Sequence, residues 1–152
     1  PYGYQQVGTT WDTSPYLPFI YRGMWFRMML PNGVTYNRTT KTFTFSEPGR
    51  KYPVILFFHG RGEGGTDNNK QLVHGGQIHR DAVLANRFQG FLVYPQSIGH
   101  VGAKDIMDKL LTDLPIDISR IYVHGLSNGG AQTWNFTISY PQLVAASFPM
   151  SA

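Results

Sequence analysis

Apolar residues fall into short, nearly continuous runs at residues 52–58, 91–94, 120–124 and 143–150. Such runs are typical of strands buried on both faces, as in a parallel sheet. Between the second and third runs, apolar residues recur at helical spacing over residues 103–114, which predicts a helix with one apolar face. Strands that alternate with helices favour an α/β fold, with a mostly parallel sheet and helices on both faces. Right-handed crossovers then bring the loops after successive strands to one edge of the sheet.

The first third of the chain follows a different pattern. Residues 1–20 are aromatic and rich in turn residues, without a clear period, and we interpret them as an N-terminal arm on the domain surface. Strands are predicted at residues 21–30 and 40–45, with a turn signal at Pro31-Asn32-Gly33. The connections there are too short for a helical crossover, so the N-terminal strands are expected to pair antiparallel. The pattern shows no internal repeat and no second domain.

Composition narrows the functional classes. The chain of 152 residues is 41% apolar and 14% charged, which indicates one folded domain. Its net charge of +4 comes from scattered basic residues, so we expect no nucleic-acid partner. The absence of cysteine excludes disulfides, Cys-ligated zinc and a thiol nucleophile. No apolar run is long enough to span a bilayer, and no histidine pair has the spacing of a helical metal site; we expect neither a metal nor a cofactor.

One pentapeptide carries the strongest chemical signal, Gly125-Leu126-Ser127-Asn128-Gly129, which follows a predicted strand and precedes a helix-like segment. Gly-x-Ser-x-Gly in this context is the pattern of a nucleophile elbow, in which the serine hydroxyl projects from the edge of the sheet. The flanking glycines leave room where side chains would collide with the backbone. Read alone, Ser-Asn-Gly-Gly is also good turn chemistry that implies no catalysis.

A second motif follows the run at residues 52–58. Residues 59–64 read His-Gly-Arg-Gly-Glu-Gly, which resembles the His-Gly-x-Gly oxyanion loop of α/β-hydrolase esterases. Residues 120–130, with Trp134 and Tyr140-Pro141 after them, are similar to the nucleophile elbow and following helix of one subgroup of that family. This subgroup contains secreted carboxylesterases related to polyhydroxybutyrate depolymerases, feruloyl and acetyl-xylan esterases, and predicted peptidases. The resemblance runs from about residue 21 to residue 152, and two motifs in the right order are far more specific than either alone.

The resemblance implies an α/β-hydrolase fold and a role for each motif residue. Ser127 would be the nucleophile that attacks an ester carbonyl. The backbone N–H of Asn128 would be one oxyanion donor, and the backbone N–H of Arg61, or otherwise that of Gly62, would be the second. The residues expected to support the oxyanion loop are His59, Gly60 and Glu63. The glutamate would fix the loop through hydrogen bonds or through an ion pair with Arg61 or Arg80.

The chain departs from the family pattern in its catalytic triad. In this fold the triad follows the order Ser, then Asp or Glu, then His, but no Asp, Glu or His follows Ser127. The last segment is an apolar strand pattern, which would leave a sheet edge open. We therefore expect residues 21–152 to be the N-terminal portion of an α/β-hydrolase domain that is incomplete at its C-terminus. The remainder of the domain would then be a partner of this chain.

The upstream histidines offer alternative bases. His100 is the best of them, because the loop after the second buried strand should reach the active-site edge. His124 is expected to point into the sheet packing. His74 and His79 fall in a polar loop before a short helix predicted at residues 81–88, and we expect both to be solvated.

Taken together, the motifs predict a serine hydrolase that cleaves carboxylic esters through an acyl-enzyme. Its substrates would be small-molecule esters, acyl or cinnamoyl esters of polysaccharides, or polyester-like chains. Two alternatives stay open: a non-catalytic, hydrolase-like module for binding or display in a larger secreted protein, and a peptidase of the same fold. Trp134 is interpreted as core packing, and Tyr94 and Gln96 as pocket lining. The start without Met, with many Tyr, Thr, Asn and Gly nearby, favours a secreted or cell-surface location.

Overall fold

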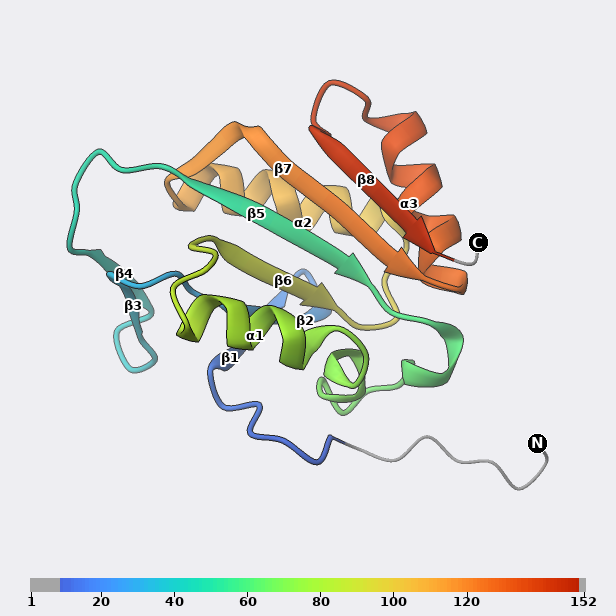
Figure 1. Ribbon diagram of the computed structural model, residues 1–152, viewed down its shortest axis with the longest axis horizontal. Coiled ribbons are helices and arrows are strands. Elements are labelled where there is room, and N and C mark those ends of the chain that lie inside the picture. The colour runs from blue at the N-terminus through green and yellow to red at the C-terminus, as the bar shows by residue number, and fades with distance from the viewer. Residues whose placement is uncertain (1–8, 151–152) are drawn as a thin grey trace.

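The computed structural model describes residues 9–150 and has three layers, with a twisted sheet between helices (Figure 1). The main sheet contains β1 (Tyr16–Tyr21), β2 (Met24–Met29), β5 (Tyr52–Phe58), β6 (Phe91–Pro95), β7 (Ile116–Leu126) and β8 (Ala146–Met150). Two further strands, β3 (Val34–Asn37) and β4 (Thr42–Phe45), form a separate small sheet. The helices are α1 (Gly76–Leu84), α2 (His100–Asp113) and α3 (Asn128–Ser139), with short 3-10 helices η1 (Arg61–Glu63) and η2 (Lys70–Leu72).

The strand order β1-β2-β6-β5-β7-β8 confirms the mostly parallel sheet with antiparallel N-terminal strands. β5 to β8 run parallel, whereas β1 pairs antiparallel with β2, and β2 antiparallel with β6. The central strand β5 is the most apolar, with Val54 opposite Phe91 on one side and opposite Ile121 on the other. Because parallel strands end at one edge of a sheet, the loops after β5, β6 and β7 meet there.

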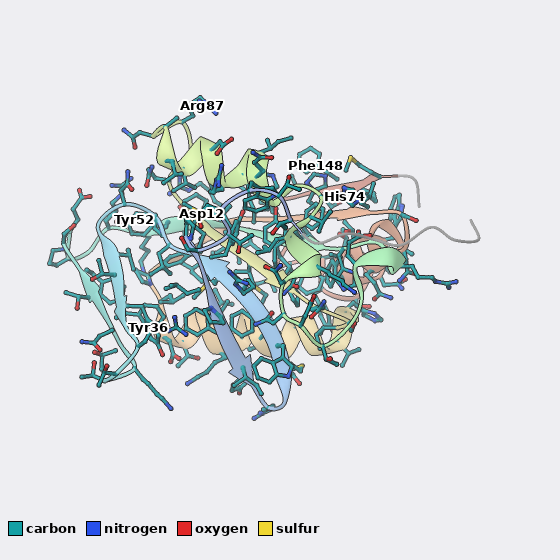
Figure 2. All side chains as sticks on the ribbon, turned by 90° about the horizontal axis from the view of Figure 1, so that it is seen from below. Asp12, Tyr36, Tyr52, His74, Arg87 and Phe148 are labelled. Carbon is teal, nitrogen blue, oxygen red and sulfur yellow. The ribbon has the colours of Figure 1, made fainter. Side chains whose placement is uncertain are left out.

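Each face of the sheet has its own core, because alternate residues of a strand point to opposite faces. On one face, α2 and α3 pack over the sheet, and this core includes Leu56, Met107 and Phe136. On the other face, α1 and η2 pack over β5 and β6, around Phe57 and Leu92. Figure 2 shows α1 and α2 on opposite sides of the sheet, as predicted. Among residues 9–150, no helix covers β7 and β8 on the α1 face (Figure 1).

The predicted N-terminal arm is too long, because residues 16–20 belong to β1. Tyr16 is fully buried, and its hydroxyl donates a hydrogen bond to Gly76 O at 2.7 Å. Pro18 obscures the strand in the sequence, but a proline is tolerated here because β1 is the edge strand of the sheet. Residues 1–8 of the predicted arm lie outside the described residues.

The helix predicted at residues 81–88 lies earlier in the chain, as α1. Gly76, the first residue of this helix, lies where packing is tight. A Cβ atom at that position would come within 2.9 Å of the Trp11 ring. The earlier start places His79 on a helix rather than in a loop.

Helix α3 does not pack on the sheet through Trp134. Its buried residues are Gly129, Gly130, Thr133 and Phe136. Trp134, interpreted as core packing, is instead 52% exposed, and Ile138 is 69% exposed. The close backbone contact that α3 makes at its start, described below, fixes this rotation of the helix.

Candidate active site

Ser127 lies exposed at the sharp turn between β7 and α3. Its backbone has a φ of 55° and a ψ of −115°, a conformation that non-glycine residues adopt only under strain. Two hydrogen bonds hold the turn: Ser127 N–H donates to Met150 O at 2.8 Å, and Gly130 N–H donates to Ser127 O at 2.8 Å. A strained serine between a strand and a helix is the geometry that exposes a nucleophilic hydroxyl at a sheet edge.

Two glycines allow this turn to close against β5. A Cβ atom on Gly129 would lie 2.0 Å from Phe58 O, and one on Gly125 would lie 2.0 Å from Gly129 O. Real Cβ atoms do not approach other atoms to within 3.0 Å, so no other residue fits either position without a backbone shift. The first turn of α3 therefore touches the end of β5, and the loop after β5 comes next to Ser127.

The loop after β5 runs through η1 and lies against the serine. A Cβ atom on Gly60 would be 3.7 Å from the Cβ of Ser127. Glu63 is buried below this loop, and its Oε1 accepts the N–H of Gly60 at 2.9 Å. Neither Arg61 nor Arg80 forms an ion pair with Glu63 in the described part of the chain, so its link to the loop is a hydrogen bond.

His59 holds the same loop through both of its ring nitrogens. Nδ1 bonds to Gly60 O, and Nε2 bonds to Ser97 N at 2.7 Å. A carbonyl oxygen only accepts and an amide N–H only donates, so Nδ1 carries the proton and Nε2 carries the lone pair. Because both nitrogens are engaged, His59 is not available to take a proton from Ser127.

Three backbone N–H groups at this edge have no acceptor within residues 9–150: those of Asn128, Arg61 and Gly62. Asn128 opens α3, where the first N–H groups have no partner within the helix and the dipole is positive. Arg61 and Gly62 directly follow Gly60, which lies next to Ser127. The arrangement suits a developing negative charge beside Ser127, and the assignment of these groups as oxyanion donors stays a prediction.

A cleft of about 290 Å³ opens beside these groups, and we call it the rim cleft. The residues that line it include Arg61, Ser97, Gly99, Asn128 and Gln132. Ser97 and Gly99 were not predicted, although their place after β6 was an available signal. For Gln132 the only signal was its helical spacing of one turn from Asn128. The cleft thus joins the loops after β5 and β6 to the start of α3.

Tyr94 and Gln96, expected to line the pocket, are buried behind it. The hydroxyl of Tyr94 bonds to Nδ1 of His79. Gln96 accepts the N–H of Asn68 at 2.7 Å and donates to Asp67 Oδ1 at 2.8 Å. Through these hydrogen bonds, both side chains connect the end of β6 to the segments packed on it.

The other histidines are placed away from the serine or are otherwise engaged. His100 begins α2, where its backbone N–H donates to Gln132 Oε1 at 2.9 Å and its Nδ1 lies 3.3 Å from the same oxygen. His74 is exposed, as expected. His124 is half-buried in the sheet packing, with its ring centroid 5.0 Å from that of Phe57.

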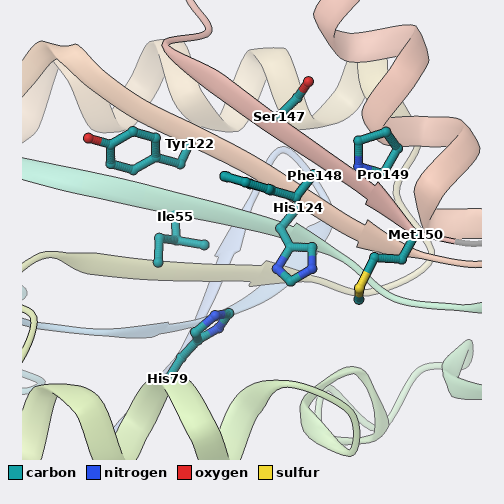
Figure 3. A pocket seen from close by; sticks show the side chains of 8 residues that line it. All are labelled: Ile55, His79, Tyr122, His124, Ser147, Phe148, Pro149 and Met150. Atoms are coloured by element: carbon teal, nitrogen blue, oxygen red, sulfur yellow. The ribbon is translucent and has the colours of Figure 1, made fainter.

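A larger cavity, of about 820 Å³, is a groove on the uncovered part of the α1 face that we call the β7–β8 groove (Figure 3). His79 from α1 and His124 from β7 face each other across it, with ring centroids 5.9 Å apart. Its other lining residues include Ile55, Tyr122 and Phe148. This lining is mostly apolar and includes none of the predicted oxyanion-loop residues. Ser127 lines neither cavity, but Arg61 and Asn128 line the rim cleft, so we assign the candidate site there.

His79 is the clear correction among the histidines, because it is largely buried rather than solvated. Burial lowers the pKa of His79 from 6.5 to about 4, and the neighbouring His124 adds to the effect. The unfolded chain therefore binds more protons than the folded one between these values, and folding stability falls as the pH drops through this window.

We expect this histidine to cost the fold about 3 kcal/mol between pH 7 and pH 4. Urea unfolding at both pH values measures the loss, and His79→Gln removes the titrating group while keeping a polar side chain. The variant should lose less stability than the wild type as the pH falls. Equal losses would show that protonation of His79 does not govern the acid sensitivity.

Comparison with known proteins is informative at the level of structure. No protein-family model and no curated protein sequence matches the chain. A solved thermostable esterase matches with a TM-score of 0.76 and 28% identity over 90% of this chain. Fluorophosphonate-binding serine hydrolase F of Staphylococcus aureus matches with a TM-score of 0.62 and 16% identity over 90% of it. An acetyl xylan esterase from Aspergillus awamori gives 0.55 and 15% over 94%.

Together with the strand order and the edge at which the loops meet, these matches define the class: the chain has the α/β-hydrolase fold. Within that class it is similar to esterases, which confirms the resemblance seen in the sequence. The chain spans 40%, 55% and 49% of the lengths of the three matching chains.

Within residues 9–150, no three side chains of His, Asp or Glu gather closely enough to hold a metal ion. The helices of this range are also too short and too polar to cross a membrane.

Proposed function

We propose that the protein is a serine esterase that forms its acyl-enzyme on Ser127. The observation that carries this proposal is the strained, exposed Ser127, set between unpartnered N–H groups from two loops at the carboxyl edge of the sheet. The similarity to solved esterases supports it. A turn that served only to reverse the chain would not need this strain, or a glycine in close backbone contact with β5.

In the proposed reaction, Ser127 Oγ attacks the ester carbonyl carbon while a base takes its proton. The N–H of Asn128 and the N–H of Arg61, with that of Gly62 as the alternative, donate to the resulting oxyanion. Donors of this kind supply about 3–4 kcal/mol of transition-state stabilisation each. The bond to the alcohol oxygen then breaks, the alcohol leaves with the proton, and water releases the acid by the reverse steps.

We further propose that the base and its acid come from a part of the protein outside residues 1–152. Both nitrogens of His59 are engaged, and no Asp, Glu or His follows Ser127 in the sequence. The matching esterases are about twice as long as this chain, which leaves ample sequence for both groups. The apolar β7–β8 groove and the exposed Trp134 supply surface that such a segment would bury.

The proposed substrates are carboxylic esters, among them acyl or cinnamoyl esters of polysaccharides and polyester-like chains. The acetyl xylan esterase among the matching structures supports the polysaccharide esters. A secreted or cell-surface location would agree with such substrates.

Labelling with a fluorophosphonate tests the proposal, because the probe forms a covalent bond only with an activated serine. The natively purified protein is treated, and its intact mass and the modified peptide are measured. We expect one adduct, on Ser127, in a protein heavier than the 17.1 kDa of this chain. A protein of 17.1 kDa without an adduct would contradict catalysis by this chain and favour a non-catalytic module.

A further inference from the structure

The rim cleft offers side-chain hydrogen-bond donors from Arg61 and Gln132. Arg61 is exposed at its wall, and a guanidinium has five N–H donors and no acceptor. Gln132 has its acceptor engaged, because Oε1 receives the backbone N–H of His100 at 2.9 Å. Its Nε2 group has no partner within residues 9–150. The hydroxyl of Ser97 is bound inside the loop, 3.0 Å from Gly65 N.

Neither carboxylate of the neighbouring loop, Glu63 or Asp67, lines the cleft. Glu63 is buried and bonded to Gly60 N. Asp67 Oδ1 accepts hydrogen bonds from Gln96 Nε2 at 2.8 Å and from the N–H groups of Asn69 and Lys70. In the described part of the chain, no carboxylate pairs with Arg61. The positive charge of Arg61 therefore has no paired carboxylate within residues 9–150.

We propose that Arg61 determines substrate specificity, and that its guanidinium, with Gln132 Nε2, selects esters that carry an ionised carboxylate close to the ester bond. The planar fork of a guanidinium matches a carboxylate through two parallel hydrogen bonds, and a side-chain amide extends that contact. The substrate class is thus an acidic ester, in which a second acid group is held while Ser127 attacks the carbonyl. This inference rests on the proposed function, since it concerns the same site.

The test compares matched ester pairs with the full-length protein. In one pair the charge lies on the alcohol side: 4-acetoxybenzoate against the neutral 4-acetoxybenzamide. In the other it lies on the acyl side: the mono-4-nitrophenyl ester of adipic acid against its terminal amide. Each pair gives a ratio of kcat/KM, that of the anionic ester over that of the neutral ester. The difference in leaving group within a pair is the same for wild type and variant, so it cancels when their ratios are compared. Arg61→Gln keeps the backbone N–H and removes the charge.

We expect Arg61→Gln to lower this ratio at least about tenfold for one of the pairs. Arg61→Lys should retain part of the preference, because it keeps the charge but loses the fork. Added salt should weaken the wild-type preference. Arg87→Gln is the matched control: this arginine is exposed after α1 (Figure 2) and does not line the cleft, so its loss should leave the ratio unchanged.

Two negative outcomes are distinguishable. If neutral esters are hydrolysed but Arg61→Gln lowers both rates of each pair equally, the specificity role is overturned while the esterase stands. If the wild-type protein hydrolyses no neutral ester and Ser127 takes no fluorophosphonate adduct, the proposed function fails and this inference fails with it.

Discussion

Ser127→Ala is expected to abolish ester hydrolysis, by roughly a millionfold in kcat, while the protein stays folded. Loss of the serine nucleophile has an effect of this size in a well-studied serine protease, where the remaining donors give only residual catalysis. The side chain is exposed and makes no hydrogen bond with the described residues, so its removal should cost the fold little. Steady-state kinetics and urea unfolding of the same preparation check both halves of the prediction.

A second substitution tests the strain at this position. Ser127→Gly should be more stable than Ser127→Ala by about 1 kcal/mol, because glycine adopts a φ of 55° without the strain of a Cβ atom. At Ser139, the exposed last residue of α3, the order should be reversed, since alanine favours a helix more than glycine. If both positions prefer alanine, the turn at Ser127 stores no strain.

Gly129→Ala has the second large effect, and it acts on the fold and the site together. The new Cβ atom would meet Phe58 O at 2.0 Å and His59 O at 2.6 Å, and both are backbone atoms of β5 and its loop. Overpacking of this kind typically costs about 1–3 kcal/mol, and we expect the upper end or more, because no side chain can rotate away. The forced separation of α3 from β5 should also abolish labelling of Ser127 by a fluorophosphonate.

Gly99→Ala is the matched control for the stability measurement. A Cβ atom there would lie 3.4 Å from Gln132 Oε1, an ordinary contact, and the backbone φ of −81° suits any residue. Gly99 is the N-cap of α2, and replacing a cap residue by alanine typically lowers the free energy of unfolding by about 1 kcal/mol, so we expect no larger cost. A urea midpoint for Gly129→Ala equal to that of Gly99→Ala would contradict the close contact between α3 and β5.

The central strands and the serine turn were predictable because their sequence signals are local. β5 and β6 are apolar throughout, and only a strand buried on both faces tolerates such a run. The strand, turn and helix around Ser127 could be predicted from Gly125 and Gly129, whose spacing fits a sharp strand-to-helix turn with close backbone contacts. Once these elements are in place, the parallel topology brings their loops to one edge.

The errors share a cause, which is that long-range packing overrode a local pattern. Tyr16 lies in β1 because its ring and hydroxyl fit against α1, a contact 60 residues away in sequence. His79 is largely buried because Gly76 lets α1 start close to Trp11. Trp134 faces solvent because Gly129 fixes the rotation of α3. None of these contacts is reflected in the periodic pattern of apolar residues from which helices and strands are predicted.

The role of Gln132 in the rim cleft shows the same limit. Its Oε1 accepts the backbone N–H of His100, 32 residues away at the start of another helix, which leaves its Nε2 group as the free donor among the described residues. A glutamine on a helix carries no signal of this kind, because the same residue type is common on solvent-exposed helical faces. The free donor of Gln132 therefore depends on the packing of α2 beside α3, which the sequence pattern does not indicate.

The two hydrogen bonds of His59 also determine how its ring will react. With the proton on Nδ1 and the lone pair of Nε2 directed at Ser97 N–H, the ring has no free nitrogen for an acylating reagent. Diethyl pyrocarbonate should therefore modify the exposed His74 well before His59. Inactivation that requires modification of a histidine would then report on a residue other than His59, so the reagent offers a chemical search for the proposed base.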